Sequence, residues 1–585
     1  MQTTSEISQK SHRFERIVFI SLSIICLVII ILLSLSPIID RDALIHHMAI
    51  PKIWMKKGIL HVDKFKPFSF YPSNTELLYY LALHLNLEFL PKILHAGFLV
   101  LSSTLVFLYI RYVTKETIAA LLGFIFLTTI PINQRLASEV YVDLSLLFFS
   151  TVAFLSFLMW KHSSFDHKRF FYISAIASGL AIGTKYNGLI TLIMINFFVV
   201  FSYARARKNS WQAISYGGQF FIIAVLLASP WLIRNYVLSG GNPIFPLFPS
   251  FFSSDIHILQ PVFMQQHGEI FFRLYSGESL LDILMLPLRL FFTGEDHNFL
   301  QFDGKLNPLM VLLLPLIFMT DTTSLPEKRP TQGQYEGENR QAKRLGLDEK
   351  YMLVFVFFVL FIVLNSSIRA RYTIAAIPPL VILNTLVIQR LIRSSVKYKK
   401  HIGYACIVCY IGYNAFYTVE LFNRLDISKY LAFQESKEAY LERKIGLYEM
   451  YEFINRGTPL DAVIYEVVSG QRSYYIDREY VHDYSITDAY FYNYAFENKP
   501  ASAYLAYLSS IGLAEGKKAT HLLIKPRFFA ESFRRIFHHP DGSKNSENEK
   551  KLRTFFAFLK SQKLLFQTRD AFLYELIYPP KTHLK

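Results

Sequence analysis

The apolar run from Ile17 to Ile39 ends directly in the stretch Asp40-Arg41-Asp42-Ala43-Leu44-Ile45-His46-His47. A run of this length can cross the hydrocarbon core of a bilayer as one helix. Two carboxylates and two imidazoles at the mouth of a membrane helix are costly beside lipid, and such residues are functional candidates by default. The stretch therefore predicts a membrane helix whose end belongs to the working site of a membrane enzyme.

The composition extends the membrane prediction to the whole chain. Of the 585 residues, 52% are apolar and 16% are aromatic, and many separate apolar runs have near-spanning length. These values predict an α-helical polytopic membrane protein and exclude an ordinary soluble domain. The formal net charge is +16, but the basic residues fall in short clusters between apolar runs, so nucleic acid is not a predicted partner. The three cysteines, Cys26, Cys406 and Cys409, lie inside apolar runs and indicate neither a disulfide framework nor a zinc site.

Eleven segments have the apolar character of membrane helices. The basic residues before the first segment predict that residues 1–16 form a cytoplasmic tail, and the same rule places most later basic clusters inside and the C-terminal part outside. Lys52, Lys56 and Lys57, in the first outer loop, run against this bias. The eleven segments are residues 17–39, 93–110, 118–133, 140–160, 171–184, 189–203, 217–233, 306–320, 351–365, 372–389 and 402–419.

The sequence also predicts a division into domains. A transmembrane domain, residues 17–424, carries two long outer loops, residues 40–91 and 235–305. We expect interfacial helices in these loops, at residues 43–57 with its lysines toward lipid headgroups, at 74–87 and at 280–292. From residue 425 to 585 the chain is polar enough for a soluble α/β domain on the outer side, with strands near 462–468, 521–524 and 572–576 and a helix at 447–456.

Charged residues gather at the outer ends of the predicted helices. The cations among them defy the positive-inside bias and therefore need another reason. Carboxylates combined with fixed cations at the outer lipid boundary suit a membrane-held phosphate that carries a group to be transferred. The residues in question are Asp40, Asp42, Glu139, Asp143, Lys185, Arg234, Arg369 and Arg371.

Several motifs together resemble a known family. They are Asp-x-Asp-x-x-x-His-His after the first helix, Glu139-Val140-Tyr141-Val142-Asp143, Gly179-Leu180-Ala181-Ile182-Gly183-Thr184-Lys185-Tyr186, and Pro230-Trp231-x-x-Arg234-Asn235 followed by Asn242-Pro243-x-x-Pro246. Their order resembles the bacterial integral-membrane glycosyltransferases of fold type C, which include the protein O-mannosyltransferases and the lipid A aminoarabinose transferase. The resemblance covers roughly Ile17 to Val419. The first outer loop of those relatives commonly reads Asp-Glu with a tyrosine shortly after, whereas this chain has Ala43 after Asp42 and His46 at the tyrosine position.

The resemblance implies an inverting glycosyltransferase on the periplasmic face of the inner membrane. It would move a sugar from a polyprenyl-phosphate donor to a hydroxyl or amine of a protein, lipid A or glycan acceptor. The residues suit this chemistry: Asp42 is the candidate base, and Lys185, Arg234 and Arg371 are candidates to bind the departing phosphate. Asp143, beside Glu139, would orient the acceptor, or hold a divalent ion if the reaction uses one. Asp40, His46, Tyr186 and Arg369 complete the predicted substrate-binding set.

Each assignment has a structural alternative. Asp40 can cap the interfacial helix, and Glu139 and Asp143 can be the ordinary polar start of a helix. His46 can be a packing residue, Lys185 can extend to the interface, and Arg369 and Arg371 can bind lipid headgroups. The run Gly294-Glu295-Asp296-His297-Asn298 resembles a metal cluster in composition but is typical of a solvated turn.

Two other functions remain open from the sequence. A lipid-linked sugar flippase or transporter would also have many helices and buried charges, but it predicts an internal repeat and charges at the midplane of the membrane. A non-catalytic envelope-assembly protein would tolerate loss of Asp42.

Overall fold

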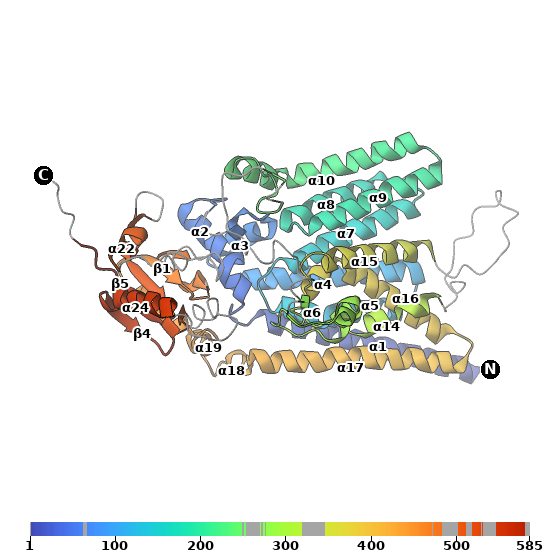
Figure 1. Cartoon of the computed structure of the whole chain (residues 1–585). Coiled ribbons are helices and arrows are strands. Elements are labelled where there is room, and N and C mark those ends of the chain that lie inside the picture. Colours follow the sequence, from blue (N-terminus) through green and yellow to red (C-terminus); the bar gives the residue numbers. More distant parts are fainter. Residues whose placement is uncertain are drawn as a thin grey trace. The chain divides into compact units, whose positions relative to one another are not determined.

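The chain folds into two units, shown in the ribbon of Figure 1. Unit 1 comprises Met1–Ser36, Tyr71–Phe245 and His267–Ala432, and unit 2 comprises Pro37–Phe70, Pro246–Gln266 and Phe433–Lys585. The structure is a computed structural model. It describes residues 2–62, 67–248, 251–252, 270, 273–274, 276–318, 346–470, 472–482, 501–510, 517–527, 529–530 and 546–579.

Unit 1 is built from helices, and Figure 1 shows its long helices side by side. The first half contains α1 (Gln2–Ser34), α3 (Asn74–His84), α4 (Leu90–Thr114), α5 (Thr117–Thr129), α6 (Pro131–Ala137), α7 (Asp143–His162), α8 (Lys168–Thr184), α9 (Gly188–Arg207) and α10 (Ser210–Ser239). The second half contains α12 (Leu280–Leu284), α13 (Leu286–Phe292), α14 (Leu309–Leu312), η3 (Leu314–Phe318), α15 (Leu347–Leu364), η5 (Ala370–Ala376), α16 (Ile377–Arg393), α17 (Lys397–Leu425) and α18 (Ser428–Leu431).

The helices confirm the polytopic membrane class. In the described residues, seven helices are long and apolar enough to cross a bilayer, and α5 with α6 makes an eighth if the bent pair is one span. Each of the other predicted spans is also helical: α8 has 17 residues, α15 begins with three charged residues, and α14 with η3 is short. The bend of 62° between α5 and α6 falls at Pro131, which lacks the N–H that would continue the helix.

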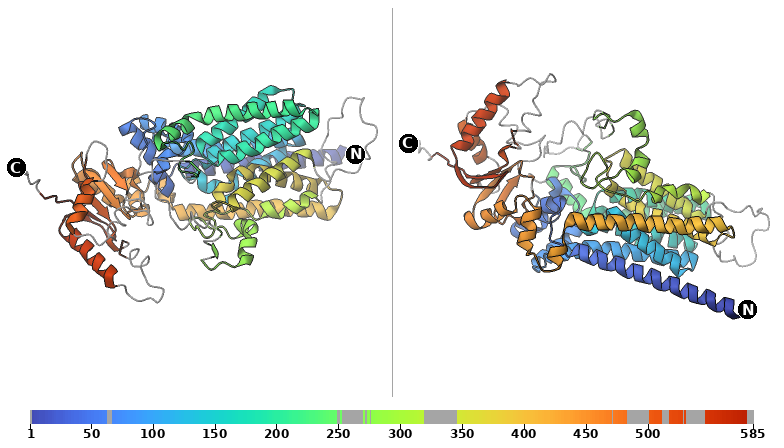
Figure 2. Two further views of the ribbon diagram at one scale, coloured as in Figure 1. Left: turned by 45° about the horizontal axis from the view of Figure 1, so that its top comes forward. Right: turned by 90° about the horizontal axis from the view of Figure 1, so that it is seen from below.

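Burial differs strongly between the helices of unit 1. The span made by η5 and α16 is buried along its whole apolar window, whereas α1 and α10 bury 22% of theirs. A helix that is apolar all round and fully enclosed packs at the centre of a bundle, and one with exposed apolar residues faces lipid. In Figure 2, α1 and α17 run as two long helices along one side of unit 1.

Unit 2 contains a five-stranded mixed sheet. Its order is β2-β1-β3-β5-β4, with β1 parallel to β2 and β3, and with β5 antiparallel to β3 and β4. The strands are β1 (Val463–Val467), β2 (Glu479–His482), β3 (His521–Ile524), β4 (Lys563–Gln567) and β5 (Phe572–Glu575). The remaining elements are η1 (Ala43–His47), α2 (Ala49–Lys57), η2 (Pro67–Phe70), α19 (Lys437–Lys444), α20 (Tyr448–Gly457), η6 (Ser473–Tyr475), α22 (Ala501–Ser510) and α24 (Ser546–Lys560).

The sheet confirms the predicted α/β character of the C-terminal region. Three of its strands, β1, β3 and β5, lie where alternation and apolar runs predicted them, and α20 matches the predicted helix. The two outer strands, β2 and β4, were not predicted. Tyr504 of α22 stacks on Phe558 of α24, and both belong to a buried cluster that includes Tyr465, Val467, Leu522 and Ile524 of the strands.

The predicted interfacial helix at residues 43–57 differs from expectation. It consists of a π-helical turn, η1, followed by α2, and its lysines do not project to headgroups. Lys52 donates hydrogen bonds to the Tyr474 and Ile476 carbonyls and pairs with Asp477 at 2.8 Å, and Lys57 pairs with Glu479 at 2.9 Å. The segment that was predicted as the first outer loop is therefore tied to the C-terminal region inside unit 2.

The predicted helix at residues 280–292 is broken into α12 and α13 at Met285 and Pro287. The prediction for residues 74–87 corresponds to α3, which ends at His84. Residues 63–66 of the first outer loop and most of residues 249–275 of the second lie outside the described residues.

Candidate active site

Asp143 and Lys185 come together at one end of unit 1. Asp143 is the first residue of α7, and Lys185 follows the last residue of α8. The Lys185 ammonium donates to the Asp143 carboxylate at 2.7 Å, with the Asp143 side chain buried and that of Lys185 20% exposed. Both charges complement their helix ends, because a helix N-terminus favours an anion and a C-terminus favours a cation.

Three cations surround one aromatic ring beside this pair. The Tyr372 ring centroid lies 4.9 Å from Lys185 Nζ, 5.5 Å from the Arg371 guanidinium and 5.7 Å from that of Arg369. Arg371 also lies 5.2 Å from the Tyr141 ring, which precedes α7. We call Asp143, Lys185, Arg369 and Arg371 around Tyr372 the Tyr372 cluster. An aromatic face offsets only part of the repulsion between neighbouring cations, so the cluster suits an anion.

A carboxyl group that was not predicted adjoins the cluster. Glu76, in the first turn of α3, is buried, and it interacts electrostatically with Lys185, Arg234 and Asp143. Burial raises the pKa of Glu76 to about 8, although the two cations oppose the shift. At neutral pH this carboxyl is therefore mostly protonated and does not neutralise the cations beside it.

Arg234, near the end of α10, continues the cationic surface. Its guanidinium lies 4.8 Å from the Trp231 ring and donates to the Tyr71 carbonyl at 3.2 Å and to Asn235 Oδ1 at 3.0 Å. Its Nη1 atom is buried and has no hydrogen-bond partner among the described residues. A buried guanidinium N–H without an acceptor is costly, which makes Arg234 a donor ready for a ligand oxygen.

Asn74 joins the helices that carry these residues. It accepts a hydrogen bond from Trp231 Nε1 at 2.8 Å and donates to the Leu180 carbonyl at 3.4 Å. Gly183 leaves the room for this contact, because a Cβ atom there would lie 2.2 Å from Asn74 Nδ2. The glycine of the Gly183-Thr184-Lys185 motif and the tryptophan of the Pro230-Trp231 motif thus meet at one asparagine.

Tyr186 has a supporting position in the structure. Its hydroxyl donates to the Phe245 carbonyl at 3.0 Å and accepts from Asn235 Nδ2 at 2.7 Å, and its ring lies edge-on to Tyr71 at 5.8 Å. Burial raises the pKa of the Tyr186 phenol, so the hydroxyl stays protonated and can donate. These bonds tie the α8–α9 connection to the chain that leaves α10.

His95 of α4 fixes the segment that leads into α7, a role that was not predicted. Its Nδ1 lies 3.0 Å from the Leu136 carbonyl and 2.9 Å from the Glu139 carbonyl, and its Nε2 accepts from the Leu144 N–H at 3.1 Å. Because Nδ1 faces two carbonyls and Nε2 faces an N–H, the geometry fits the neutral tautomer protonated at Nδ1. A lone histidine in an apolar helix carries no sequence signal for this role.

Glu139 belongs to a second group of charges. It pairs with Arg135 at 2.9 Å, and Arg135 also pairs with Asp303 at 3.0 Å and with Asp296 at 3.5 Å. Asp296 in turn accepts from Arg424 at 2.7 Å and from the Tyr417 hydroxyl at 2.6 Å. We call Arg135, Glu139, Asp296, Asp303 and Arg424 the Arg135 cluster.

The Arg135 cluster corrects the prediction for the run around Asp296. The run is a turn in which Glu295 and His297 are exposed, as predicted, but Asp296 is buried in the cluster. Burial alone would raise the pKa of Asp296, but Arg135, Arg424 and the Tyr417 hydroxyl outweigh it and lower the pKa. Burial and the same two arginines lower the pKa of His297 to about 4. Among the described residues, no group of three or more His, Cys, Asp or Glu side chains converges as metal ligands would.

Asp40, Asp42 and His46 lie in unit 2. Asp42 is the residue before η1 and has no side-chain capping bond to it, and Asp40 is buried. His46 stacks on Phe68 with ring centroids 4.5 Å apart. The Tyr475 hydroxyl donates to the Ile38 carbonyl at 2.8 Å, which holds the start of this segment to η6. Their role at the site stays a prediction.

Comparison with known proteins supports the fold. A family model described as dolichyl-phosphate-mannose-protein mannosyltransferase matches residues 85–239, the part that carries Asp143, Lys185 and Arg234. No curated protein sequence matches the chain significantly.

Solved structures resemble the chain over almost its whole length. ArnT from Cupriavidus metallidurans bound to undecaprenyl phosphate has 13% sequence identity and a TM-score of 0.55, covering 95% of this chain and 97% of that one. The apo state of the same protein gives 12% identity and a TM-score of 0.54, covering 96% and 98%. The oligosaccharyltransferase AglB from Archaeoglobus fulgidus, in complex with an inhibitory peptide and a dolichol-phosphate, gives 14% identity and a TM-score of 0.48, covering 91% and 74%. The match to ArnT confirms the integral-membrane glycosyltransferase fold of type C that the motifs predicted.

Proposed function

We propose that the chain is a glycosyltransferase that takes a sugar from a polyprenyl-phosphate donor and transfers it, with inversion, to an acceptor hydroxyl or amine. The observation that carries the proposal is the Tyr372 cluster, in which Lys185, Arg369 and Arg371 share one ring and the Asp143 carboxylate pairs with Lys185. Fixed cations of this density suit a phosphate whose negative charge grows as the sugar leaves.

The proposed phosphate site uses both arginine and lysine. Arg371 can engage two phosphate oxygens through the guanidinium fork, Arg234 can donate from its Nη1 atom, and Lys185 acts as a point charge. Asp143 holds the Lys185 ammonium at 2.7 Å and so fixes where that charge stands. Support comes from ArnT of Cupriavidus metallidurans, whose solved structure has undecaprenyl phosphate bound. We propose the same class of lipid phosphate here.

The proposed reaction is one displacement. The acceptor oxygen or nitrogen forms a bond to the anomeric carbon while the bond from that carbon to the phosphate oxygen breaks. The acceptor proton passes to the Asp42 carboxylate, and polyprenyl phosphate leaves with the bonding electron pair. The barrier falls because the base is positioned and the leaving group is stabilised by the cations of the cluster. Asp40, His46 and Glu139 act around this centre as binding or supporting residues.

We place the reaction at the periplasmic face of the inner membrane, with unit 2 on that side. The basic residues of the predicted cytoplasmic tail and inner loops support this orientation. The sheet of unit 2 is then available for acceptor recognition. Protein, lipid A and another glycan remain the acceptor classes.

The test is transfer by purified protein in liposomes, with a radiolabelled polyprenyl-phosphate sugar and a periplasmic extract as acceptor source. We expect label in a new covalent product, and a loss of about 10²- to 10⁴-fold in Asp42→Asn, the range of a missing general base. Asp461→Asn, an exposed aspartate of unit 2, is the matched control and should retain activity. Label that crosses the bilayer without a new bond would establish a flippase, and full transfer by Asp42→Asn would remove Asp42 from the mechanism.

A further inference from the structure

A cavity lies at the end of unit 1 that is remote from Asp143. It has a volume of about 790 Å³ and is bordered by the C-terminal ends of α7 and α9 and the N-terminal end of α15. Figure 1 shows the ends of α9 and α15 at this end of the bundle. We call it the α9–α15 pocket. It has no part in the proposed transfer reaction.

The pocket is apolar toward the membrane interior and cationic at the helix ends. On α9, Phe197 and Phe201 have exposed rings, and Arg205 follows one turn after Phe201. On α15, Lys350 stands at the start and the exposed Val354 follows one turn later. At 1.5 Å of rise per residue, Arg205 lies about 12 Å along the axis from Phe197. Along the axis of α9, the aromatic side chains are thus followed by a cation within the distance that separates the acyl chains of a lipid from its headgroup.

The carboxylates near the pocket already have partners. Asp348 accepts from Lys161 and His162 at 2.5 Å each, and Glu349 pairs with Arg390. Neither Arg205 nor Lys350 has an ion-pair partner in the parts of the chain that the structure describes. A third exposed cation of the lining, Arg207, pairs with Asp166 at 3.1 Å. The pocket therefore presents Arg205 and Lys350 above an aromatic groove, while Asp166, Asp348 and Glu349 each pair with another cation.

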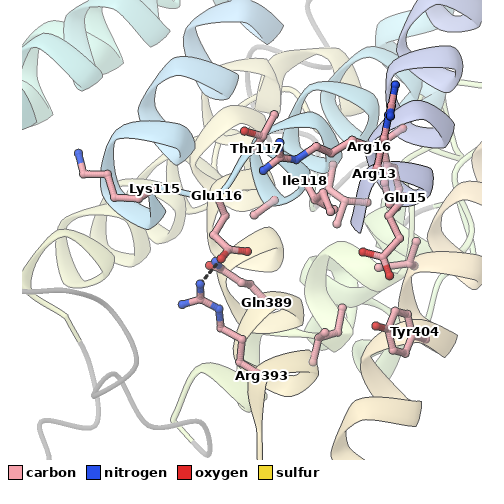
Figure 3. A pocket seen from close by; sticks show the side chains of 15 residues that line it. Arg13, Glu15, Arg16, Lys115, Glu116, Thr117, Ile118, Gln389, Arg393 and Tyr404 are labelled. Atoms are coloured by element: carbon pink, nitrogen blue, oxygen red, sulfur yellow. Dashed lines mark hydrogen bonds and ion pairs between the residues drawn. The ribbon is translucent and has the colours of Figure 1, made fainter. Parts of the chain in front are cut away.

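A cavity at the same end of the bundle provides a comparison. It has a volume of about 950 Å³ and lies between α1, α5, α16 and α17. Figure 3 shows that its cations are accompanied by carboxylates: Glu116 pairs with Arg393, Glu15 borders the cavity, and Lys115 points away from it. Location at a basic membrane face alone therefore does not produce the unneutralised arrangement of the α9–α15 pocket.

We propose that the α9–α15 pocket binds an anionic glycerophospholipid. The phosphate lies between Arg205 and Lys350, and an acyl chain covers Phe197, Phe201 and Val354. Charge complementarity selects an anionic headgroup, and the aromatic groove selects a lipid over a soluble phosphate. A lipid held there joins α9 and α15, beside the end of α7 that is opposite to Asp143.

Native mass spectrometry of the full-length protein in detergent tests the proposal, with phosphatidylglycerol and phosphatidylcholine as probes. We expect retention of phosphatidylglycerol and a rise in Tm, since a ligand of the folded state stabilises it. Loss of one cation near a membrane surface weakens the affinity for an anionic lipid about five-fold. The double variant Arg205→Gln with Lys350→Gln should therefore bind phosphatidylglycerol about 25-fold more weakly. Both side chains are exposed, so the variant should fold.

The matched control is Arg16→Gln with Lys115→Gln, which removes the same number of exposed charges from the border of the comparison cavity. Phosphatidylglycerol binding should be unchanged in this control. An equal loss in both double variants would overturn the proposal in favour of general surface attraction. Equal retention of phosphatidylcholine, or an equal rise in Tm with inorganic phosphate, would overturn the choice of an anionic lipid.

Discussion

The Arg135 cluster and the Tyr372 cluster of unit 1 both bury charge, yet they differ in balance. The Arg135 cluster has two cations and three carboxylates, and its members pair with one another or with the Tyr417 hydroxyl. The Tyr372 cluster has three cations and one carboxylate, with aromatic faces as further neighbours. A buried cluster whose charges pair with one another serves the scaffold, whereas a cation such as Arg369, which contacts aromatic rings and has no ion pair with a described residue, is available to a ligand anion.

The largest expected effect is on the balanced cluster. Arg135→Met leaves Glu139, Asp296 and Asp303 buried without their shared cation, and we expect a loss of about 3–5 kcal/mol in the free energy of unfolding. The measurement is the Tm and the yield of folded protein in detergent. Arg393→Met, which breaks the more exposed pair with Glu116, is the control and should change stability little. If the Arg135→Met protein is stable but binds the donor less well, the Arg135 cluster is a donor-binding site and not part of the scaffold.

The next effect concerns the cationic cluster. Arg369 has no ion pair with any described residue and contacts the Phe299 and Tyr372 rings. Arg369→Ala should therefore leave Tm almost unchanged but remove a charged hydrogen bond to the lipid phosphate, weakening donor affinity about ten- to hundred-fold. Titration with polyprenyl phosphate measures the affinity. Arg169→Ala, at the start of α8, is the control and should leave the affinity unchanged. A large loss of Tm with unchanged affinity would show that Arg369 is a scaffold residue.

The contrast between the clusters also explains what the sequence could predict. Asp143 and Lys185 were predicted to share one face because a helix beginning outside and the next one ending outside must meet there. The structure places these two residues 2.7 Å apart. The sequence could not separate Glu139 from Asp143, since both read as the polar start of a helix. The difference depends on Arg135 and Asp303, and the latter comes from a segment far along the chain.

The roles of Glu76 and Asp296 could not be predicted from the sequence, for the same physical reason. Glu76 reads as an ordinary acid in a first helical turn, and only burial against Lys185 and Arg234 shows that it belongs to the site. Asp296 reads as part of a solvated turn, and Arg135, Arg424 and the Tyr417 hydroxyl offset the cost of its burial. Hydropathy and helix-end signals are local, so they predicted the helices. The partners that decide the state of a buried charge are not local.

A third prediction tests the packing under the Tyr372 cluster. In Gly183→Ala the new Cβ would lie 2.2 Å from Asn74 Nδ2, so Asn74 must move and its bond with Trp231 weakens. We expect a loss of about 1–3 kcal/mol, the usual cost of overpacking, with reduced activity. Gly218→Ala in α10, where a Cβ meets nothing within 4 Å, is the control and should be neutral or stabilising.

The double variant Gly183→Ala with Asn74→Ala identifies the cause. Removing the Asn74 side chain removes the clash. The double variant should therefore lose less stability than the sum of the losses in the two single variants. Strict additivity of the two changes in stability would show that Gly183 matters for another reason.

The last prediction concerns the pH response of Glu76, which interacts electrostatically with Lys185 and Arg234. Burial raises its pKa from the ordinary 4.5 to about 8. Between these values the folded protein holds a proton that the unfolded chain does not, so the free energy of unfolding falls as pH rises and levels off above about 8. Glu76→Gln should lack this fall, which a Tm series across pH measures.

The same ionisation should alter donor binding. Above about pH 8 the carboxylate adds negative charge beside the cations that are proposed to bind phosphate. We expect donor affinity to fall about two- to ten-fold between pH 7 and pH 9, the range for one charge across a partly screened distance. Glu76→Gln keeps the shape of the side chain and should keep its affinity over this range. An identical pH profile in both proteins would mean that Glu76 is isolated from the cationic site, as a member of a balanced scaffold cluster would be.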